Sequence, residues 1–221
     1  MINKAFCRKV SSASLGGYDV KYNTWDLCER AIKEGIPGDF VEAGTYKGSH
    51  PMIMAEVAKL YDPSRRIHLY DSFDGVPKVR EEKDEVEVKT YGKSEDGSLQ
   101  SSGNAFASIQ HTKDAFAAND ACLNNCIFHK GWFQDVLPNE DIPIIAVLRI
   151  DVDLMESNDI CMDYFYPKLS MGGYFITDDW GKAKDSPWKQ VFYDKVKELG
   201  FGQPDPTVIH NEPGTAWWKK V

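Results

Sequence analysis

Two clusters of carboxylates follow strand-like apolar runs in this chain. Asp151, Asp153 and Glu156 come at the end of IIAVLRI, and Asp178 and Asp179 come at the end of GGYFIT. Carboxylates at the ends of buried strands repel one another and lose hydration, and both effects raise their pKa values. A divalent cation such as Mg²⁺, which prefers oxygen ligands, removes both costs. If the two strands are neighbours, the sequence predicts a metal site formed by Asp151, Asp178 and Asp179.

A second feature combines a glycine turn with an acid on the next strand. The segment EAGTYKG, residues 42–48, joins an apolar run to a helix, so Gly44 permits a tight turn and the helix N-terminus offers free N–H groups. Asp71 ends RRIHLYD, the position where an acid accepts a ribose hydroxyl. Together these residues favour a nucleoside cofactor. The absence of G-x-G-x-x-G weighs against a dinucleotide, while a plain structural turn and an N-cap role for Asp71 stay open as alternatives.

The elements that must position these groups alternate along the chain. Strand-like runs cover 39–44, 65–71, 126–131, 144–151 and 173–178, and helical patterns cover 23–33, 52–60, 108–118, 160–166 and 188–199. The runs TVIHN and AWWKKV, separated by EPGT, predict a closing antiparallel hairpin. This alternation specifies an α/β fold with a doubly wound, mostly parallel sheet. Ligands bind such sheets beyond the carboxyl ends of the strands, where both chemical features lie.

Length and composition predict one domain over residues 1–221, since the chain has 221 residues with 42% apolar content. Residues 1–20 are expected to form an N-terminal arm, loosely ordered over its first part. Residues 78–107 are charged and poor in large apolar side chains, and they predict an insertion. This insertion is either a flexible surface segment or a lid over a ligand site.

The charge balance restricts the partners. A formal net charge of −8 and a pI near 5.2 argue against a nucleic-acid partner, which needs a basic surface. The N-terminal residues lack the apolar segment of a signal peptide, and no run is long enough to cross a membrane. Five cysteines without metal-site spacing predict reduced thiols. We therefore expect a cytoplasmic enzyme without a membrane or nucleic-acid partner.

Several longer stretches resemble the TylF/MycF family of macrocin-type O-methyltransferases, which use S-adenosylmethionine and Mg²⁺. The resemblance is carried by YNTWDLCERAIKEGIPGDFVEAGTYKGS, IHLYDSFDGVP, FHKGWFQDVLP and AVLRIDVDLMESNDICMDYFYPKLSMGGYFITDDWG. It implies the seven-stranded, Rossmann-like class I methyltransferase fold with a C-terminal hairpin. By the same resemblance Asp151, Asp178 and Asp179 are metal ligands and Asp153 is the general base. The implied cofactor-binding residues are Glu42, Ala43, Gly44, Thr45, Tyr46, Asp71, Ser72, Phe73, Gly75, Val76, Ser108 and Gly131.

The resemblance implies transfer of a methyl group to a hydroxyl of a sugar or a related natural-product or polysaccharide acceptor. Thr45 and Tyr46 stand where the family has Val and Trp, and the charged stretch Glu81–Glu87 also departs from the family pattern. Trp132 and Phe133 either flank the adenine or belong to the core. Two other functions stay open: a glycosyltransferase that holds its metal with D-x-D, and a catechol- or phenol-type O-methyltransferase. Exposed tryptophans and the arm make a dimer or larger homo-oligomer conceivable.

Overall fold

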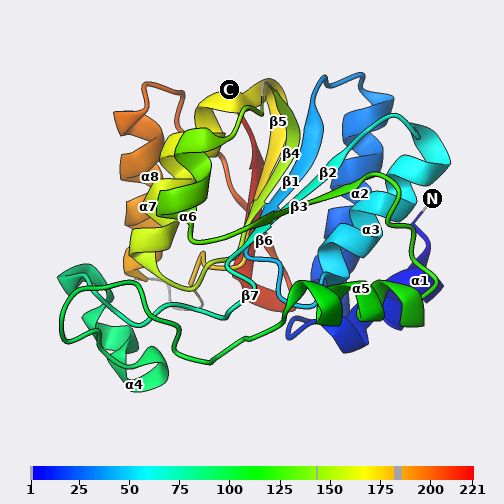
Figure 1. Cartoon of the computed structure of the whole chain (residues 1–221). Helices are drawn as coiled ribbons and strands as arrows, with labels where there is room; N and C mark the ends of the chain where they lie inside the picture. Colours follow the sequence, from blue (N-terminus) through cyan, green and yellow to red (C-terminus); the bar gives the residue numbers. More distant parts are fainter. Residues whose placement is uncertain (1, 143, 182–185) are drawn as a thin grey trace.

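The computed structural model describes residues 2–142, 144–181 and 186–221. Its centre is a seven-stranded sheet in the order β3-β2-β1-β4-β5-β7-β6 (Figure 1). Strands β1 to β5 pair in parallel, and β7 runs antiparallel to both of its neighbours. The predicted α/β fold with a closing hairpin is therefore confirmed. The strands are β1 Asp39–Ala43, β2 Ile67–Asp71, β3 Cys126–Lys130, β4 Ile145–Ile150, β5 Leu169–Thr177, β6 Thr207–Ile209 and β7 Glu212–Lys219.

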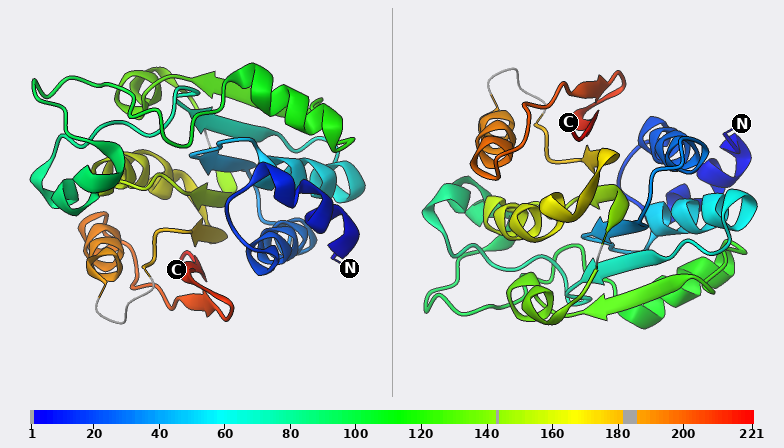
Figure 2. Two further views of the ribbon diagram at one scale, coloured as in Figure 1. Left: turned by 90° about the horizontal axis from the view of Figure 1, so that it is seen from below. Right: turned by 90° about the horizontal axis from the view of Figure 1, so that it is seen from above.

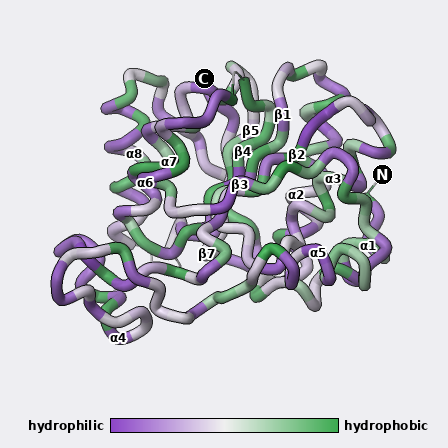
Figure 3. Tube along the Cα trace, viewed as in Figure 1, coloured by the Kyte–Doolittle hydropathy of each residue, from purple (hydrophilic) through white to green (hydrophobic). Residues whose placement is uncertain are grey.

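Helices cover both faces of the sheet, so an apolar core forms on each side. Helices α2 and α3 pack on one face together with the N-terminal residues, and α6, α7 and α8 pack on the other (Figure 1). The strands between these layers are predominantly hydrophobic (Figure 3). The α-helices are α1 Lys4–Lys9, α2 Tyr18–Lys33, α3 Ser49–Tyr61, α4 Val88–Tyr91, α5 Ile109–Ala118, α6 Phe133–Val136, α7 Met155–Phe165 and α8 Pro187–Glu198. Short 3₁₀ helices are η1 Val10–Ala13, η2 Glu82–Glu87, η3 Leu137–Asn139 and η4 Tyr166–Lys168.

The N-terminal arm is more ordered than the sequence predicts. Residues 4–13 form α1 and η1, and α2 begins at Tyr18 rather than at Asn23. Cys7 and Val10 are fully buried in the same core as Trp25. The apolar residues Cys7, Val10 and Ala13 recur every third position, so they share one face of the arm. That face packs against helices α2 and α3, which explains why the arm is not a loose segment.

The hairpin forms as expected, but its turn lies earlier in the sequence. Ile209 pairs with Glu212, so His210 and Asn211 make the turn and the predicted turn residues 212–215 belong to β7. An irregularity in the register between Val208 and Ile209 accommodates this shift. None of the helices in the described part of the chain is long and apolar enough to cross a membrane.

The insertion, residues 78–107, packs against helix α7. It contains η2 and α4, and isolated bridges join Pro77 to Ser101 and Val79 to Lys93. The Asp84 carboxylate, 2% exposed, accepts hydrogen bonds from the backbone N–H groups of Met155 (2.7 Å) and Glu156 (3.0 Å). This side chain caps the N-terminus of α7 across 71 residues of sequence, since α7 has no side-chain cap of its own.

Two ion pairs strengthen the same attachment. Arg80 pairs with Glu156, and Lys83 pairs with Asp159 at 2.5 Å. Both acidic partners belong to the first half of α7. Figure 2 shows the insertion beside α7 in two opposite views. The insertion is therefore attached to α7, and both alternatives, a flexible surface segment and a lid, stay predictions.

We expect Asp84→Ala to lower the free energy of unfolding by about 1–2 kcal/mol, because two helix N–H groups lose their acceptor. Urea denaturation followed by circular dichroism measures this difference. Glu82→Ala is the matched control, since it removes an exposed carboxylate from the same 3₁₀ helix. Equal destabilisation by both substitutions would contradict the capping role.

Candidate active site

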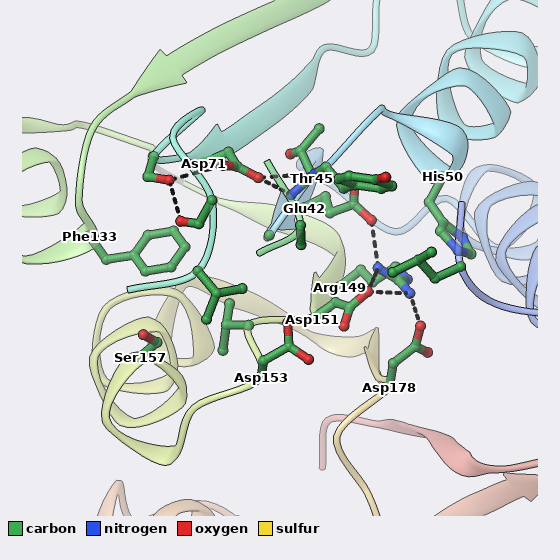
Figure 4. Close-up of a pocket in the computed structure, with 18 of the residues that line it drawn as sticks. Glu42, Thr45, His50, Asp71, Phe133, Arg149, Asp151, Asp153, Ser157 and Asp178 are labelled. Atoms are coloured by element: carbon green, nitrogen blue, oxygen red, sulfur yellow. Dashed lines mark hydrogen bonds and ion pairs between the residues drawn. The ribbon is translucent and has the colours of Figure 1, made fainter. Parts of the chain in front are cut away.

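The loops at the carboxyl ends of β1, β2, β4 and β5 enclose one cavity (Figure 4). The chain proceeds outward from β1 to β3 on one side and from β4 to β5 on the other, so the cavity lies at the topological switch point of the sheet. The arm contributes one wall and the residues before α6 another. The lining residues are 13–16, 42, 44–46, 49, 50, 71, 72, 75–77, 105, 131–134, 149, 151–153, 157 and 178.

Asp71 joins the turns that follow β1 and β2. Its carboxylate accepts hydrogen bonds from the backbone N–H groups of Thr45 (2.7 Å), Tyr46 (3.0 Å) and Phe73 (2.7 Å). Tyr46 and Phe73 have positive φ angles of 49° and 51°, a region that costs a non-glycine residue free energy. The hydrogen bonds that these N–H groups donate to Asp71 hold the two turns in place. The acid predicted to bind a cofactor hydroxyl therefore also shapes the loop beside it.

Gly44 lies where no side chain fits. Its φ is +83°, and a Cβ atom there would lie 1.7 Å from the carbonyl oxygen of Asp151. The turn after β1 and the loop after β4 are therefore in direct backbone contact. This close approach is the structural reason for the glycine that the sequence places at the end of the first strand.

A buried guanidinium organises the acids of this cavity. Arg149 donates to Glu42 Oε1 at 2.6 Å and to Asp151 Oδ2 at 3.2 Å from each Nη atom, and it pairs with Asp178. The side chains of Arg149 and Glu42 are each 1% exposed. Because removing such charges from water is expensive, the network depends on all of its partners. It fixes the ends of β1, β4 and β5 relative to one another.

The cavity nevertheless contains more acidic than basic side chains. Its described lining contains five carboxyl groups and one guanidinium, and burial lowers the pKa of His50 well below its ordinary value, so this imidazole is neutral. Burial raises the pKa of Glu42 well above its ordinary value, and Glu42 Oε2 has no hydrogen-bond partner among the described residues. A buried carboxyl oxygen without a partner favours a ligand that forms a hydrogen bond with it. A cationic ligand would favour the ionised forms of these acids, so the site is suited to such a ligand. The five carboxylates are Glu42, Asp71, Asp151, Asp153 and Asp178.

Three of the acids form a compact triplet. One carboxylate oxygen from each of Asp151, Asp153 and Asp179 lies within 4.8 Å of the others. Asp179 Oδ2 accepts from the backbone N–H groups of Val152 (3.1 Å) and Asp153 (3.3 Å), which ties the end of β5 to the loop after β4. Asp153 has a φ of 63°, so this loop is strained where its carboxylate faces the cavity.

Burial and like charge raise the pKa values of the triplet. Burial raises the pKa of Asp151 to about 7 against the effect of Arg149. The pKa of Asp179 lies well above its ordinary value, because of burial and then because of Asp151 and Asp153. Burial also raises the pKa of Asp153. Three oxygen ligands under this repulsion fit a hard divalent cation.

Asp178 stands apart from the triplet. Its Oδ1 accepts a hydrogen bond from Thr215 at 2.9 Å, and its Oδ2 pairs with Arg149. The compact triplet of the structure thus contains Asp153, whereas the sequence predicts Asp178 as the third metal ligand, and that ligand set stays a prediction. Successive residues at a strand end point to opposite sides, so Asp178 faces the guanidinium while Asp179 faces the loop after β4.

Most of the predicted cofactor residues line the cavity, and three do not. Ala43 is buried within β1, and Phe73 is buried against Phe128. Ser108 caps α5, where its hydroxyl accepts from the N–H of His111. Asp179 belongs to the triplet but not to the lining. The predicted residues that do line the cavity are Glu42, Gly44, Thr45, Tyr46, Asp71, Ser72, Gly75, Val76 and Gly131, with Asp151, Asp153 and Asp178.

The sequence analysis missed several lining residues. Arg149 carried a usable signal, since a charged side chain within the apolar run IIAVLRI must have buried partners. His50 and Ser157 occupy helices beside the site and gave no comparable signal. The arm residues 13–16 gave none either.

Comparison with known proteins identifies the family that shares this fold. The sequence model of the family described as Macrocin-O-methyltransferase (TylF) matches residues 15–201. The chain belongs to this family. The resemblance inferred from the strand-end motifs is thus confirmed, as is the class I methyltransferase fold.

Named relatives from the TylF family have moderate sequence identity to this chain. The demethyldecarbamoylnovobiocin O-methyltransferase of Streptomyces niveus is 34% identical over 160 residues, covering 72% of this chain and 58% of the relative. The mycinamicin III 3''-O-methyltransferase of Micromonospora griseorubida is 30% identical over 161 residues, covering 72% of this chain and 61% of the relative. The chain therefore spans less than two thirds of the length of these relatives. The solved O-methyltransferase NovP superimposes with a TM-score of 0.80 at 26% identity, covering 95% of this chain and 82% of that one.

We expect Asp179→Asn to stabilise the metal-free TylF-family protein by roughly 1 kcal/mol, or about 2–4 °C in Tm. The amide oxygen still accepts from the two backbone N–H groups, while one buried charge disappears. The raised pKa makes the folded wild type bind a proton more tightly than the unfolded chain does. Wild-type stability therefore falls as the pH rises above the ordinary aspartate value.

Thermal unfolding in EDTA between about pH 5 and about pH 8 measures this effect. The advantage of the variant should grow with pH, because the unfolded wild type increasingly releases the Asp179 proton that the folded wild type retains. The control is Asp205→Asn, which changes an exposed carboxylate outside the cavity lining. A variant less stable than wild type at the upper pH would refute the repulsion argument.

Proposed function

We propose that this protein transfers a methyl group from S-adenosylmethionine to a hydroxyl of a sugar-bearing natural product or a related glycan. The observation that carries the proposal is the acidic cavity at the switch point, with a buried, unpartnered oxygen on Glu42. Family membership supports the same reaction class. The relatives named above are O-methyltransferases of novobiocin- and mycinamicin-type compounds, which supports the acceptor class.

The charge of the cavity supports the cofactor. S-adenosylmethionine carries a sulfonium and an ammonium, and the lining offers five carboxylates against one guanidinium. The ammonium group is a suitable donor for Glu42 Oε2, while Asp71 lies at the end of β2 where a ribose hydroxyl binds in such folds. A glycosyltransferase would have to bind a nucleoside diphosphate in this negative cavity. The same charge excess therefore disfavours the D-x-D alternative.

The acid triplet supports a metal ion at the acceptor end. Asp151, Asp153 and Asp179 would hold a hard divalent cation such as Mg²⁺. When bound, such an ion lowers the pKa of a coordinated hydroxyl and fixes its orientation. Asp151 and Asp179 also belong to the set predicted from the sequence. We place Asp153 third because its oxygen lies within the triplet, whereas Asp178 is engaged by Arg149 and Thr215.

The residues of the chain then have separate tasks in methyl transfer. The acceptor oxygen forms a bond to the methyl carbon as the carbon–sulfur bond breaks, and the product is neutral S-adenosylhomocysteine. The Asp153 carboxylate faces the cavity and can take the hydroxyl proton on the oxygen not used by a metal. Arg149 and Asp71 hold the loops that align the two reactants. Such alignment supplies roughly 7–11 kcal/mol of barrier reduction in favourable cases.

We expect S-adenosylhomocysteine to bind wild type with micromolar affinity and Asp71→Ala at least about tenfold more weakly, because the turns after β1 and β2 lose their shared acceptor. Isothermal titration calorimetry with and without Mg²⁺ measures the affinity of each protein for S-adenosylhomocysteine. The control is Asp205→Ala at an exposed carboxylate outside the cavity lining. No binding to wild type under either condition would remove the methyltransferase proposal.

The ligand set can be tested with Mn²⁺ as a spectroscopic substitute for Mg²⁺. We expect Asp151→Asn to abolish Mn²⁺ binding and Asp153→Asn to weaken it strongly, because both oxygens belong to the triplet. Asp178→Asn should retain most of the affinity, since its carboxylate faces Arg149. Electron paramagnetic resonance of free Mn²⁺ measures the Mn²⁺ dissociation constant of each variant. Loss of binding in Asp178→Asn with retention in Asp153→Asn would restore the set predicted from the sequence.

A further inference from the structure

We propose that His50 is a further cofactor-binding residue, whose Nε2 atom donates a hydrogen bond to the carboxylate at the amino-acid end of S-adenosylmethionine. This inference rests on the proposed function and names the part of the cofactor that one end of the cavity binds. His50 lies in the first turn of α3, is 4% exposed and lines the cavity. Its Nε2 atom has no hydrogen-bond partner among the described residues. Buried polar atoms are normally paired, so this nitrogen indicates a bound ligand.

Helix α2 holds the His50 ring by its other nitrogen. The hydroxyl of Thr24, a fully buried residue, lies 2.8 Å from His50 Nδ1 and 3.1 Å from the carbonyl oxygen of Val20. The shorter contact favours donation of the hydroxyl proton to Nδ1, since the Val20 carbonyl also belongs to the hydrogen-bond ladder of α2. A neutral imidazole that accepts at Nδ1 carries its proton on Nε2. The ring therefore presents a donor to the cavity.

The N-terminus of α3 lies at the same end of the cavity. This helix has 13 residues, and no side chain caps its first N–H groups, because the N-cap residue is Gly48. Ser49, the first residue of the helix, lines the cavity together with His50. The free N–H groups and the dipole of a helix favour an anion at this position. The unpartnered nitrogen of His50 is independent evidence for a ligand on the same turn.

Two buried cations lie near this end of the cavity. Figure 4 shows the His50 ring and the Arg149 guanidinium at one end of the cavity, and Arg149 Nε is a second donor without a partner among the described residues. Lys21 is 0% exposed and precedes Thr24 by one turn of α2. Its ammonium group donates to the backbone carbonyl of Gly16, which lines the cavity. An anionic group is therefore favoured here, although the lining as a whole is acidic.

The amino-acid end of S-adenosylmethionine carries two opposite charges, and the cavity offers a group for each. Glu42 Oε2 suits the ammonium, while His50 Nε2 and the first N–H groups of α3 suit the carboxylate. Arg149 connects the two positions, since it donates to Glu42 Oε1 at 2.6 Å and lies at the same end of the cavity as His50. Fixing both charges limits rotation of the chain that carries the sulfonium. The methyl group is thereby directed toward the acceptor.

The carboxylate itself provides the test, because decarboxylated S-adenosylmethionine keeps the adenosine, the sulfonium and the ammonium. Isothermal titration calorimetry with both compounds gives the ratio of their affinities for each protein. We expect His50→Leu to bind S-adenosylmethionine about 10- to 100-fold more weakly than wild type, the usual effect of losing a hydrogen bond to a charged group. Its affinity for the decarboxylated compound should change by less than about threefold, because the removed interaction is absent there.

Two further variants control for folding. His68→Leu makes the same change at a buried histidine of β2 that lies outside the cavity lining. Its ratio of affinities should equal that of wild type, since a loss of folded protein weakens both ligands alike. His50→Gln keeps a polar side chain beside Thr24 and a donor in reach of the cavity. Its ratio should lie between those of wild type and His50→Leu.

The possible outcomes separate the two proposals. Failure of wild type to bind S-adenosylmethionine and S-adenosylhomocysteine counts against the proposed function. If wild type binds the cofactor, equal affinities of wild type and His50→Leu for S-adenosylmethionine overturn the role of His50 alone. Equal weakening of both compounds in His50→Leu also overturns it, because the imidazole would then not act on the carboxylate. A loss confined to the compound with the carboxylate supports the assignment.

Discussion

The geometry of this molecule depends on one buried cation. The Arg149 guanidinium is 1% exposed and lies among Glu42, Asp151 and Asp178, which come from three different strand ends. Buried charges of this kind are tolerated only with their partners in place, so the carboxyl ends of β1, β4 and β5 are fixed together. One guanidinium cannot neutralise all the acids that line the cavity. The acidic character that suits a sulfonium cofactor therefore arises beside the same charge network that holds the strand ends together.

The sequence was most informative where chemistry and strand ends coincide. Gly44, Asp71 and the acids after β4 and β5 could be located because ligand sites of parallel sheets lie at strand ends. The direction in which each side chain points could not be predicted, because it depends on the backbone geometry at the end of the strand. Asp178, for example, is predicted as a metal ligand from its place in the sequence, and only the structure shows that its carboxylate pairs with Arg149. The cap that Asp84 provides joins positions 71 residues apart, and no local pattern indicates such a contact.

The departures from the family pattern have a simple explanation in the turn after β1. Thr45 and Tyr46 differ in side chain from the residues typical of the family, but they contact Asp71 through their backbone N–H groups. Any residue that adopts this turn supplies the same donors. The side chains are consequently free to vary toward the cavity they line. The insertion, whose residues are mostly hydrophilic (Figure 3), has a similar freedom away from its contacts with α7.

The position of β7 has a consequence for how the molecule folds. β7 lies between β5 and β6, so among the described strands β6 pairs with its hairpin partner alone. The same strand β7 carries Thr215, whose hydroxyl reaches Asp178. Docking of the hairpin on β5 therefore also brings Thr215 to an acid of the buried charge network. A ligand that binds the cavity would consequently report when this edge of the sheet is in place.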